Sequence, residues 1–374
     1  MNLKIKAYNR KMNLPWITTQ VDICPIPFHY DTYIGCPHGC LYCFARDNVN
    51  FRRRKSSLKF NQLEFNSVKN FHRKINQYLI KKINYNDPLT VFLKNKVPIK
   101  IGANSDPFPK IEIKNQVTYN ILQILKELDY PIQVQTKRPE VFLEYADDFK
   151  DYKNLVISVT CVFTDELAKK IEPNVLVTSE RFKAIKELTN KGFSVMIKCQ
   201  PAIYPIILNT LDFLIENSFN SGCWAFQTEG LKLRIAASQK EKYYYLELGK
   251  LLGINNIYEY YKQEIRTTSD YELSIPKKIK YTKKAKNLSH KFGLKYFSAD
   301  NQEECIRLSD GDECCGTERL HNYKKVTYNF RTKIFTGKSW QELENGLEKC
   351  IYTGRNLADG ISLKDLVHKK LNRK

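Results

Sequence analysis

Three cysteines lie within eight residues of one short segment, YIGCPHGCLYCFARD, at positions 33–47. Cys36, Cys40 and Cys43 have the spacing C-x3-C-x2-C, which is too tight for them to pair into distant disulfides. Thiolates on a short loop are the ligands that hold iron–sulfur clusters. Three thiolates on a four-iron cluster leave one iron without a protein ligand, and an open metal position is where a substrate or cofactor binds. The segment therefore predicts a [4Fe-4S] cluster with one open iron.

A zinc ion is the alternative for the same loop. Structural zinc takes four ligands, often as two separated pairs, so a zinc site here needs a remote ligand such as His38 or Cys24. Gly35 and Gly39 favour the cluster, because glycine lets a loop curl tightly around a cube of iron and sulfur.

A second group of cysteines lies nearer the C-terminus. Cys305, Cys314 and Cys315 fall within eleven residues of the acidic segment EECIRLSDGDECCGTERL at 303–320, and Cys350 is available as a fourth ligand. The acidic residues raise thiol pKa values, which disfavours thiolates, but they also attract a cation. Three interpretations stay open for this group: a second iron–sulfur cluster, a structural zinc ion, or thiols without a ligand role.

The composition is that of a globular protein with reduced thiols. The chain has 374 residues, of which 42% are hydrophobic and 12% aromatic, enough for one large α/β domain with an appendage or for two domains. It has no run of 18 apolar residues, and its N-terminal 20 residues lack the apolar core of a secretory signal. We therefore expect a cytoplasmic protein without a membrane partner, whose 11 cysteines bind metal, act in catalysis or fill the core.

The charge balance is strongly basic. Lysine and arginine number 61 against 40 acidic residues, which gives a formal net charge of +21. Two segments concentrate this charge, 51–60 directly after the cysteine loop and 277–296, where basic and aromatic residues alternate. The excess favours a polyanionic partner such as a nucleic acid, although a basic surface that serves only solubility has the same composition.

Short apolar runs alternate with amphipathic segments between the cysteine loop and residue 255. Strands alternating with helices form right-handed crossovers in a parallel sheet, and sites in such sheets lie at the C-terminal ends of the strands. The cysteine loop directly follows the first strand. The pattern predicts an α/β fold with a partial (β/α)6 barrel at 1–255 and a basic, less regular C-terminal region at 256–374. The expected strands are 29–35, 97–103, 131–137, 155–161, 193–200 and 223–229, and the expected helices are 116–129, 179–192, 205–217 and 241–253.

The cysteine motif, with Tyr42 before its last cysteine, resembles the signature of radical S-adenosylmethionine enzymes. The segments 101–112, 134–142 and 157–205 resemble the spore photoproduct lyase-like group of that superfamily, and the likeness extends over roughly residues 20 to 230. It implies that the open iron binds the amino and carboxylate groups of S-adenosylmethionine. One electron, from a donor such as flavodoxin or ferredoxin, then yields a 5′-deoxyadenosyl radical that abstracts hydrogen.

The resemblance also implies roles for single residues, each of which has a purely structural alternative. Cluster ligation falls to the three loop cysteines. The structural alternatives are ordinary packing for Tyr42 and Phe44, a turn at Asp106-Pro107, a solvated side chain for Lys137, a half-polar strand face for Ser158 and Thr160, and an ion pair without catalytic duty for Glu172 and Arg181. The implied roles are shielding and adenine contact by Tyr42 and Phe44, binding of the methionine amino group by Asn104, Ser105 and Asp106, binding of its carboxylate by Lys137, contacts to the ribose or carboxylate by Ser158 and Thr160, and cofactor binding by Arg181, which with Glu172 matches the spacing of the family.

One position departs from the lyase pattern. The lyase has a cysteine in the second-strand segment that returns a hydrogen atom to the repaired thymine, and Ala103 occupies that position here. Cys161 and Cys199, at the ends of later strands, are candidate hydrogen donors in its place or else buried core residues. We therefore expect radical-based repair or modification of a nucleic acid or nucleobase rather than repair of the thymine dimer itself. The alternatives are a peptide or small metabolite as substrate, or a metal protein that binds nucleic acid without turnover.

Overall fold

The computed structural model describes residues 6–7, 14–17, 26, 28–46, 63–81, 88–311, 314–321, 328–329 and 334–335. The basic segment 51–60, the zinc candidate Cys24 and the candidate ligand Cys350 lie outside these residues. None of the described helices is long and apolar enough to cross a membrane.

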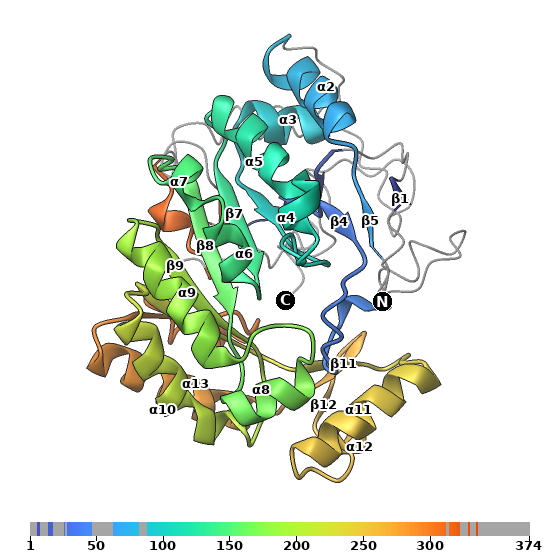
Figure 1. The fold of residues 1–374 in the computed structure, drawn as a ribbon. Coiled ribbons are helices and arrows are strands. Elements are labelled where there is room, and N and C mark those ends of the chain that lie inside the picture. The colour runs from blue at the N-terminus through green and yellow to red at the C-terminus, as the bar shows by residue number, and fades with distance from the viewer. Residues whose placement is uncertain are drawn as a thin grey trace.

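One open sheet organises the chain (Figure 1). Its strands follow the order β14-β10-β9-β8-β7-β6-β3-β2, and all neighbours pair in parallel except β2, which runs antiparallel at the edge. The two edge strands are not paired to each other in the described part of the chain, which agrees with a partial barrel. The strands are β2 (Trp16–Ile17), β3 (Phe28–Tyr30), β6 (Ile99–Ile101), β7 (Ile132–Thr136), β8 (Leu155–Thr160), β9 (Val195–Ala202), β10 (Ala225–Gly230) and β14 (Lys295–Ser298).

The two faces of this sheet have different neighbours. Successive residues of a strand point to opposite faces, and in β9 Ile197 and Cys199 join the main hydrophobic core with the helices. Met196, between Val195 and Ile197, belongs instead to a small separate cluster with Cys314 and Cys315. The helices of the core are α5 (Val117–Glu127), α6 (Pro139–Leu143), α9 (Thr178–Asn190), α10 (Ile207–Asn220) and α13 (Ile275–Lys291).

Two local expectations are wrong in detail. The first expected strand, 29–35, is divided into β3 and β4 (Tyr33–Ile34), and β4 pairs with β5 (Glu64–Phe65) in a separate small sheet that also contains β1 (Lys6–Ala7). The helix expected from residue 179 begins one residue earlier, as α9 with Val177 at its N-cap, and the Ser179 hydroxyl and backbone N–H donate to Asp165.

The sheet continues beyond residue 255, where the expected boundary lies. After β10 the chain forms α11 (Gln239–Leu251), α12 (Ile257–Lys262) and a small antiparallel sheet, and then α13 returns it to the main sheet as β14. The region from 256 onward therefore supplies a seventh parallel strand. The remaining elements are α2 (Val68–Leu79), α3 (Pro88–Lys94), α4 (Glu112–Asn115), α7 (Ala146–Phe149), α8 (Asp165–Ile171), α14 (Glu303–Ile306), the 3-10 turn Thr317–Arg319, and the strands β11 (Lys232–Arg234), β12 (Ile265–Arg266), β13 (Asp270–Glu272), β15 (Tyr328–Asn329) and β16 (Ile334–Phe335).

Candidate active site

The cysteine loop follows β4 and is fastened to the end of helix α8. The Leu41 N–H donates to the Ile171 carbonyl at 3.1 Å, and the Asn174 side chain donates to the Pro37 carbonyl at 2.9 Å. Gly39 has a φ of +71°, and a Cβ at this position would lie 3.3 Å from the Asn174 amide nitrogen. Glycine is required here on two grounds, because its φ is in the left-handed region and because the neighbouring loop comes close.

The three loop cysteines are free thiols. Burial raises the pKa of Cys36 to about 12 and raises that of Cys40 well above its usual value, and the neighbouring thiol of Cys43 adds to both rises. Cys36 and Cys40 therefore need a cationic partner to ionise, which a metal cluster would supply. No three His, Cys, Asp or Glu side chains of the described residues converge as ligands of a single ion. Each thiolate of a four-iron cluster binds a different iron, so three thiols on one short loop are a donor set that fits such a cluster.

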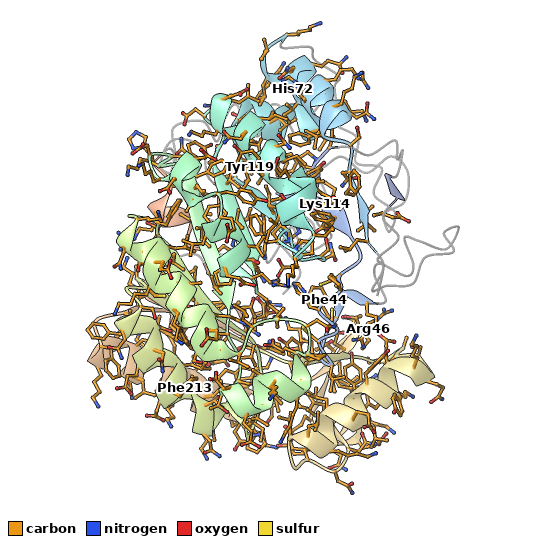
Figure 2. All side chains as sticks on the ribbon, viewed as in Figure 1. Phe44, Arg46, His72, Lys114, Tyr119 and Phe213 are labelled. Atoms are coloured by element: carbon orange, nitrogen blue, oxygen red, sulfur yellow. The ribbon has the colours of Figure 1, made fainter. Side chains whose placement is uncertain are left out.

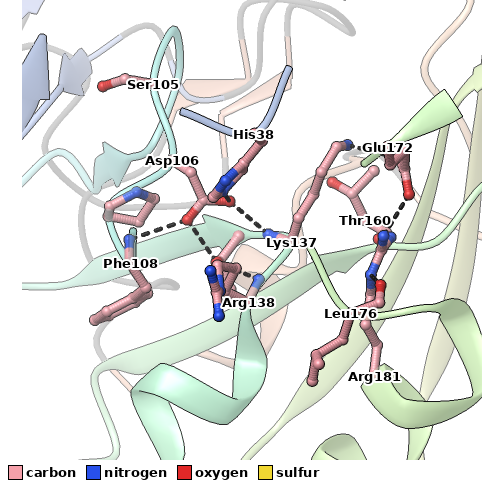
Figure 3. Close-up of polar contacts among 12 residues, drawn as sticks. His38, Ser105, Asp106, Phe108, Lys137, Arg138, Thr160, Glu172, Leu176 and Arg181 are labelled. Carbon is pink, nitrogen blue, oxygen red and sulfur yellow. Dashed lines mark hydrogen bonds and ion pairs between the residues drawn. The ribbon is translucent and has the colours of Figure 1, made fainter. Parts of the chain in front are cut away.

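Asp106 connects the cysteine loop to two strand ends (Figure 3). Its carboxylate accepts hydrogen bonds from the Thr136 hydroxyl at 2.7 Å, the Lys137 N–H at 2.7 Å and the Phe108 N–H at 3.0 Å. His38 Nε2, from the cysteine loop, lies 3.1 Å from Asp106 Oδ2. Burial alone would raise the pKa of Asp106, but His38 and these N–H groups outweigh it and lower the pKa to about 2. Asp106 is thus an ionised brace between β6, β7 and the loop.

The two residues before Asp106 also have protein partners. Asn104 donates from its backbone and its side chain to the two carboxylate oxygens of Asp31, each at 2.9 Å. The Ser105 hydroxyl donates to the Tyr33 carbonyl. Sequence reasoning missed Asp31, although a carboxylate directly after a buried strand is a signal for a site residue. The contact of Asn104, Ser105 and Asp106 with a methionine amino group stays a prediction.

A second buried charge cluster joins helix α9 to the cysteine loop. Glu172 accepts hydrogen bonds from the Tyr42 hydroxyl and from Arg181, and the side chains of Glu172 and Arg181 are 0% exposed. Arg181 also donates to the carbonyls of Thr160 at 2.9 Å and Leu176 at 2.8 Å (Figure 3). Each of the three guanidinium nitrogens of Arg181 therefore has a protein partner, and its contact with the cofactor, which the resemblance implies, stays a prediction.

Lys137 lies at the open side of this cluster. Its ammonium is 3.5 Å from Glu172 Oε1 and 5.1 Å from the centre of the Tyr42 ring, and its side chain keeps 14% exposure. Burial alone would raise the pKa of Glu172, but Arg181 and Lys137 outweigh it, so the pKa is lowered and the group is a carboxylate. Of the two cationic side chains in this cluster, Arg181 is fully buried and Lys137 is partly exposed.

The other expected site residues divide between the site and the core. Tyr42 is buried, whereas Phe44 is 56% exposed (Figure 2). The Ser158 hydroxyl accepts a hydrogen bond from Gln133 at 2.9 Å. Cys161 and Cys199 are fully buried in the core shared with the helices, and burial raises the pKa of Cys161 to about 12. Their environment is that of core residues.

The second group of cysteines is divided between the faces of β14. Cys305, in α14, interacts with Thr282 of α13 and with Tyr296 of β14. Cys314 and Cys315 instead pack against Phe297, the next residue of β14, in the separate cluster with Met196. These three described thiols do not form a common metal site.

Comparisons with known proteins agree with this architecture. No family model matches the chain. An uncharacterised protein of Methanocaldococcus jannaschii is 26% identical over 280 residues, which are 72% of this chain and 95% of that protein. A spore photoproduct lyase variant superposes with a TM-score of 0.53 at 10% identity, over 79% of this chain and 81% of that chain. Another variant, with bound AdoMet and dinucleoside spore photoproduct, superposes over the same shares with a TM-score of 0.51 at 10% identity. The chain therefore has the radical S-adenosylmethionine fold of spore photoproduct lyase, as its motifs predicted.

Proposed function

We propose that this chain is a radical S-adenosylmethionine enzyme, with Cys36, Cys40 and Cys43 as ligands of a [4Fe-4S] cluster and S-adenosylmethionine bound beside Lys137. The observation that carries the proposal is a loop of three thiols held against the ends of β6 and β7, next to an accessible ammonium group. The bound cofactors supply a 5′-deoxyadenosyl radical, which abstracts a hydrogen atom from the substrate.

The residues of the chain bind, orient and shield in this scheme. Lys137 is assigned to the carboxylate of the methionine moiety, because its ammonium is held at the site but is not fully enclosed. Asp106 fixes the loop through His38 and would thereby help to position a cluster held by the loop cysteines. Tyr42, which is 6% exposed and bonded to Glu172, excludes water from one side of the loop.

The proposed substrate is a nucleic acid or a nucleobase, which the enzyme repairs or otherwise modifies. Support comes from the net charge of +21 and from the likeness to a lyase that binds a dinucleoside photoproduct. The basic segment 277–296 gives less support, because four lysines of α13 are paired with carboxylates. These are Lys277 with Glu264, Lys278 with Glu272, Lys284 with Asp212 and Lys286 with Asp310.

The proposal includes an electron donor and a cytoplasmic location. A reduced cluster requires a one-electron donor, for which flavodoxin or ferredoxin are the candidates. Free thiols such as those of this chain persist where the compartment is reducing.

An anaerobic assay tests the proposal directly. Reconstituted protein with reductant and S-adenosylmethionine should form 5′-deoxyadenosine, and candidate DNA or RNA should raise the yield. Changing Cys36, Cys40 and Cys43 together to Ala should abolish both the brown cluster and the product. Cys223→Ala is the matched control, because Cys223 is a buried cysteine of the main core. Unchanged product formation by the triple variant would refute the assignment.

A further inference from the structure

Gln227 lies on the face of the main sheet that turns away from the helices. It is paired in register with Lys198 of β9 and with Phe297 of β14, and directly paired residues of parallel strands share a face. We call this the inner face and define it by Met196, Lys198, Ala225, Gln227 and Phe297. Met196, Ala225 and Phe297 belong to the small cluster with Cys314 and Cys315 and not to the helix-side core, and the strand register places Lys198 and Gln227 on the same face.

The amide of Gln227 is buried without a partner. Its side chain is 0% exposed, and neither the amide oxygen nor the amide nitrogen has a hydrogen-bond partner among the described residues. Buried polar side chains in native proteins are nearly always hydrogen-bonded, and the exceptions call for an explanation such as a missing ligand. A residue that served only packing would be apolar at this position.

The surroundings of Gln227 combine an apolar layer with a cationic edge. Met196, Ala225 and Phe297 belong to one hydrophobic cluster. Ala225 lies two residues before Gln227 on β10 and is paired with Met196 of β9, whereas Phe297 of β14 is paired with Gln227 itself. Lys198, directly across from it, places its ammonium 3.4 Å from Gln135 Oε1 and 3.4 Å from Cys315 Sγ. An apolar layer beside fixed donors and acceptors is how proteins hold a small planar ligand.

We propose that Gln227, together with Lys198, binds the edge of a planar ring that carries a hydrogen-bond donor beside an acceptor, as every nucleobase does. The glutamine amide presents one acceptor and one donor group in a plane, which suits a bidentate contact with such an edge. Lys198 supplies a third donor for a ring carbonyl. Met196 and Phe297 offer apolar contact to the ring.

This inference rests on the proposed function, since it places the reacting ring near the cofactor site. Lys137 follows the end of β7, and Gln227 lies on β10, three strands away in the same sheet. Strands are spaced about 4.8 Å apart, so the two residues are separated by roughly 14 Å along the sheet. A cofactor bound beside Lys137 and a base bound at Gln227 would thus lie near each other at the same sheet.

The variant Gln227→Leu tests whether the amide of Gln227 binds a ligand or instead stabilises the folded protein. Leucine keeps a similar volume and removes the unpaired polar atoms, so the variant without ligand should melt at a temperature higher by about 2 °C or more. Its response to ligand should be lost. The experiment is thermal melting of the anaerobically reconstituted full chain with thymidine, uridine, cytidine, guanosine or adenosine, and with ribose as the control ligand.

At least one nucleoside, but not ribose, should raise the melting temperature of the unaltered protein. In Gln227→Leu the nucleoside concentration needed for the same rise should be at least tenfold higher. Gln263→Leu is the control variant, because Gln263 is exposed at the end of α12. A lower melting temperature for Gln227→Leu would show that the amide is structurally paired and would overturn the inference. Equal nucleoside responses in both proteins, or none in either, would also overturn it. Formation of 5′-deoxyadenosine by the same preparation is scored separately, so the inference can fail while the proposed function stands.

Discussion

Removing the guanidinium of Arg181 should destabilise the protein strongly, because it leaves the charge of Glu172 buried. Both side chains are 0% exposed, and Arg181 also satisfies the carbonyls of Thr160 and Leu176. Breaking a buried ion pair by removing one partner costs about 3–5 kcal/mol. For 374 residues at about 2.1 cal/mol/K each, the unfolding entropy is about 0.8 kcal/mol/K. Arg181→Met should therefore lower the melting temperature by about 4–6 °C.

The pH dependence of the stability loss in Arg181→Met tests whether the buried charge of Glu172 causes that loss. Its pKa is lowered in the folded state, so the pairing contributes stability above the ordinary glutamate value of 4.5 and loses it as the pH falls through the folded pKa. The difference between the unaltered protein and Arg181→Met should be largest above pH 4.5 and should narrow in acid. The assay is thermal or urea unfolding followed by circular dichroism at several pH values.

A matched control removes an exposed pair from the same helix. Lys183 is 72% exposed and lies 2.7 Å from Glu180, so Lys183→Met should leave the melting temperature nearly unchanged. The reasoning is refuted if Arg181→Met melts within about 1 °C of the unaltered protein, or if its deficit is the same at every pH.

Further predictions concern the cofactors and the substrate. Lys137→Met should weaken S-adenosylmethionine binding at least tenfold in equilibrium dialysis, with the iron content unchanged; equal affinity would remove Lys137 from the cofactor site. Gly39→Ala should lower the free energy of unfolding by about 1–2 kcal/mol, because position 39 has a left-handed φ. It should also lower the iron retained after reconstitution, measured by iron analysis. Gly192→Ala is the control, because Gly192 is also left-handed but has open space around it. Reconstituted protein should hold about four irons per chain, unchanged when Cys314 and Cys315 are both made Ala; about eight irons, reduced by that change, would instead show a second cluster. Affinity for DNA or RNA should fall with salt, linearly in log K against log salt, and salt-independent binding would count against a nucleic-acid substrate.

Local patterns in the sequence were sufficient to predict the fold class and the place of the cysteine loop. Hydrophobic periodicity is local, so the segment 116–129 predicted a helix that the structure has as α5 at Val117–Glu127. The strands expected at 131–137 and 155–161 likewise correspond to β7 and β8. The spacing of three cysteines after the first strand is also local, because a short loop cannot separate residues that close in sequence.

The protein partners of the polar site residues could not be predicted from the sequence. Cofactor contacts of Asp106 and Arg181 stay predictions, whereas the structure shows that Asp106 braces the loop through His38 and that Arg181 pairs with Glu172. These partners come from different strands and helices, and their meeting depends on strand order and register, which no single segment encodes.

The cysteines near the C-terminus show the same limit. Cys305 and Cys314 are close in sequence, yet Cys305 lies near enough to Tyr296 to raise its pKa, whereas Cys314 belongs to the cluster of Phe297, the next residue of β14. Consecutive strand residues point to opposite faces, so the path of the chain around that strand separates thiols whose spacing suggested a common site. The spacing of two residues along the chain predicts that they lie together only where the segment between them is too short to carry them to different sides of a strand.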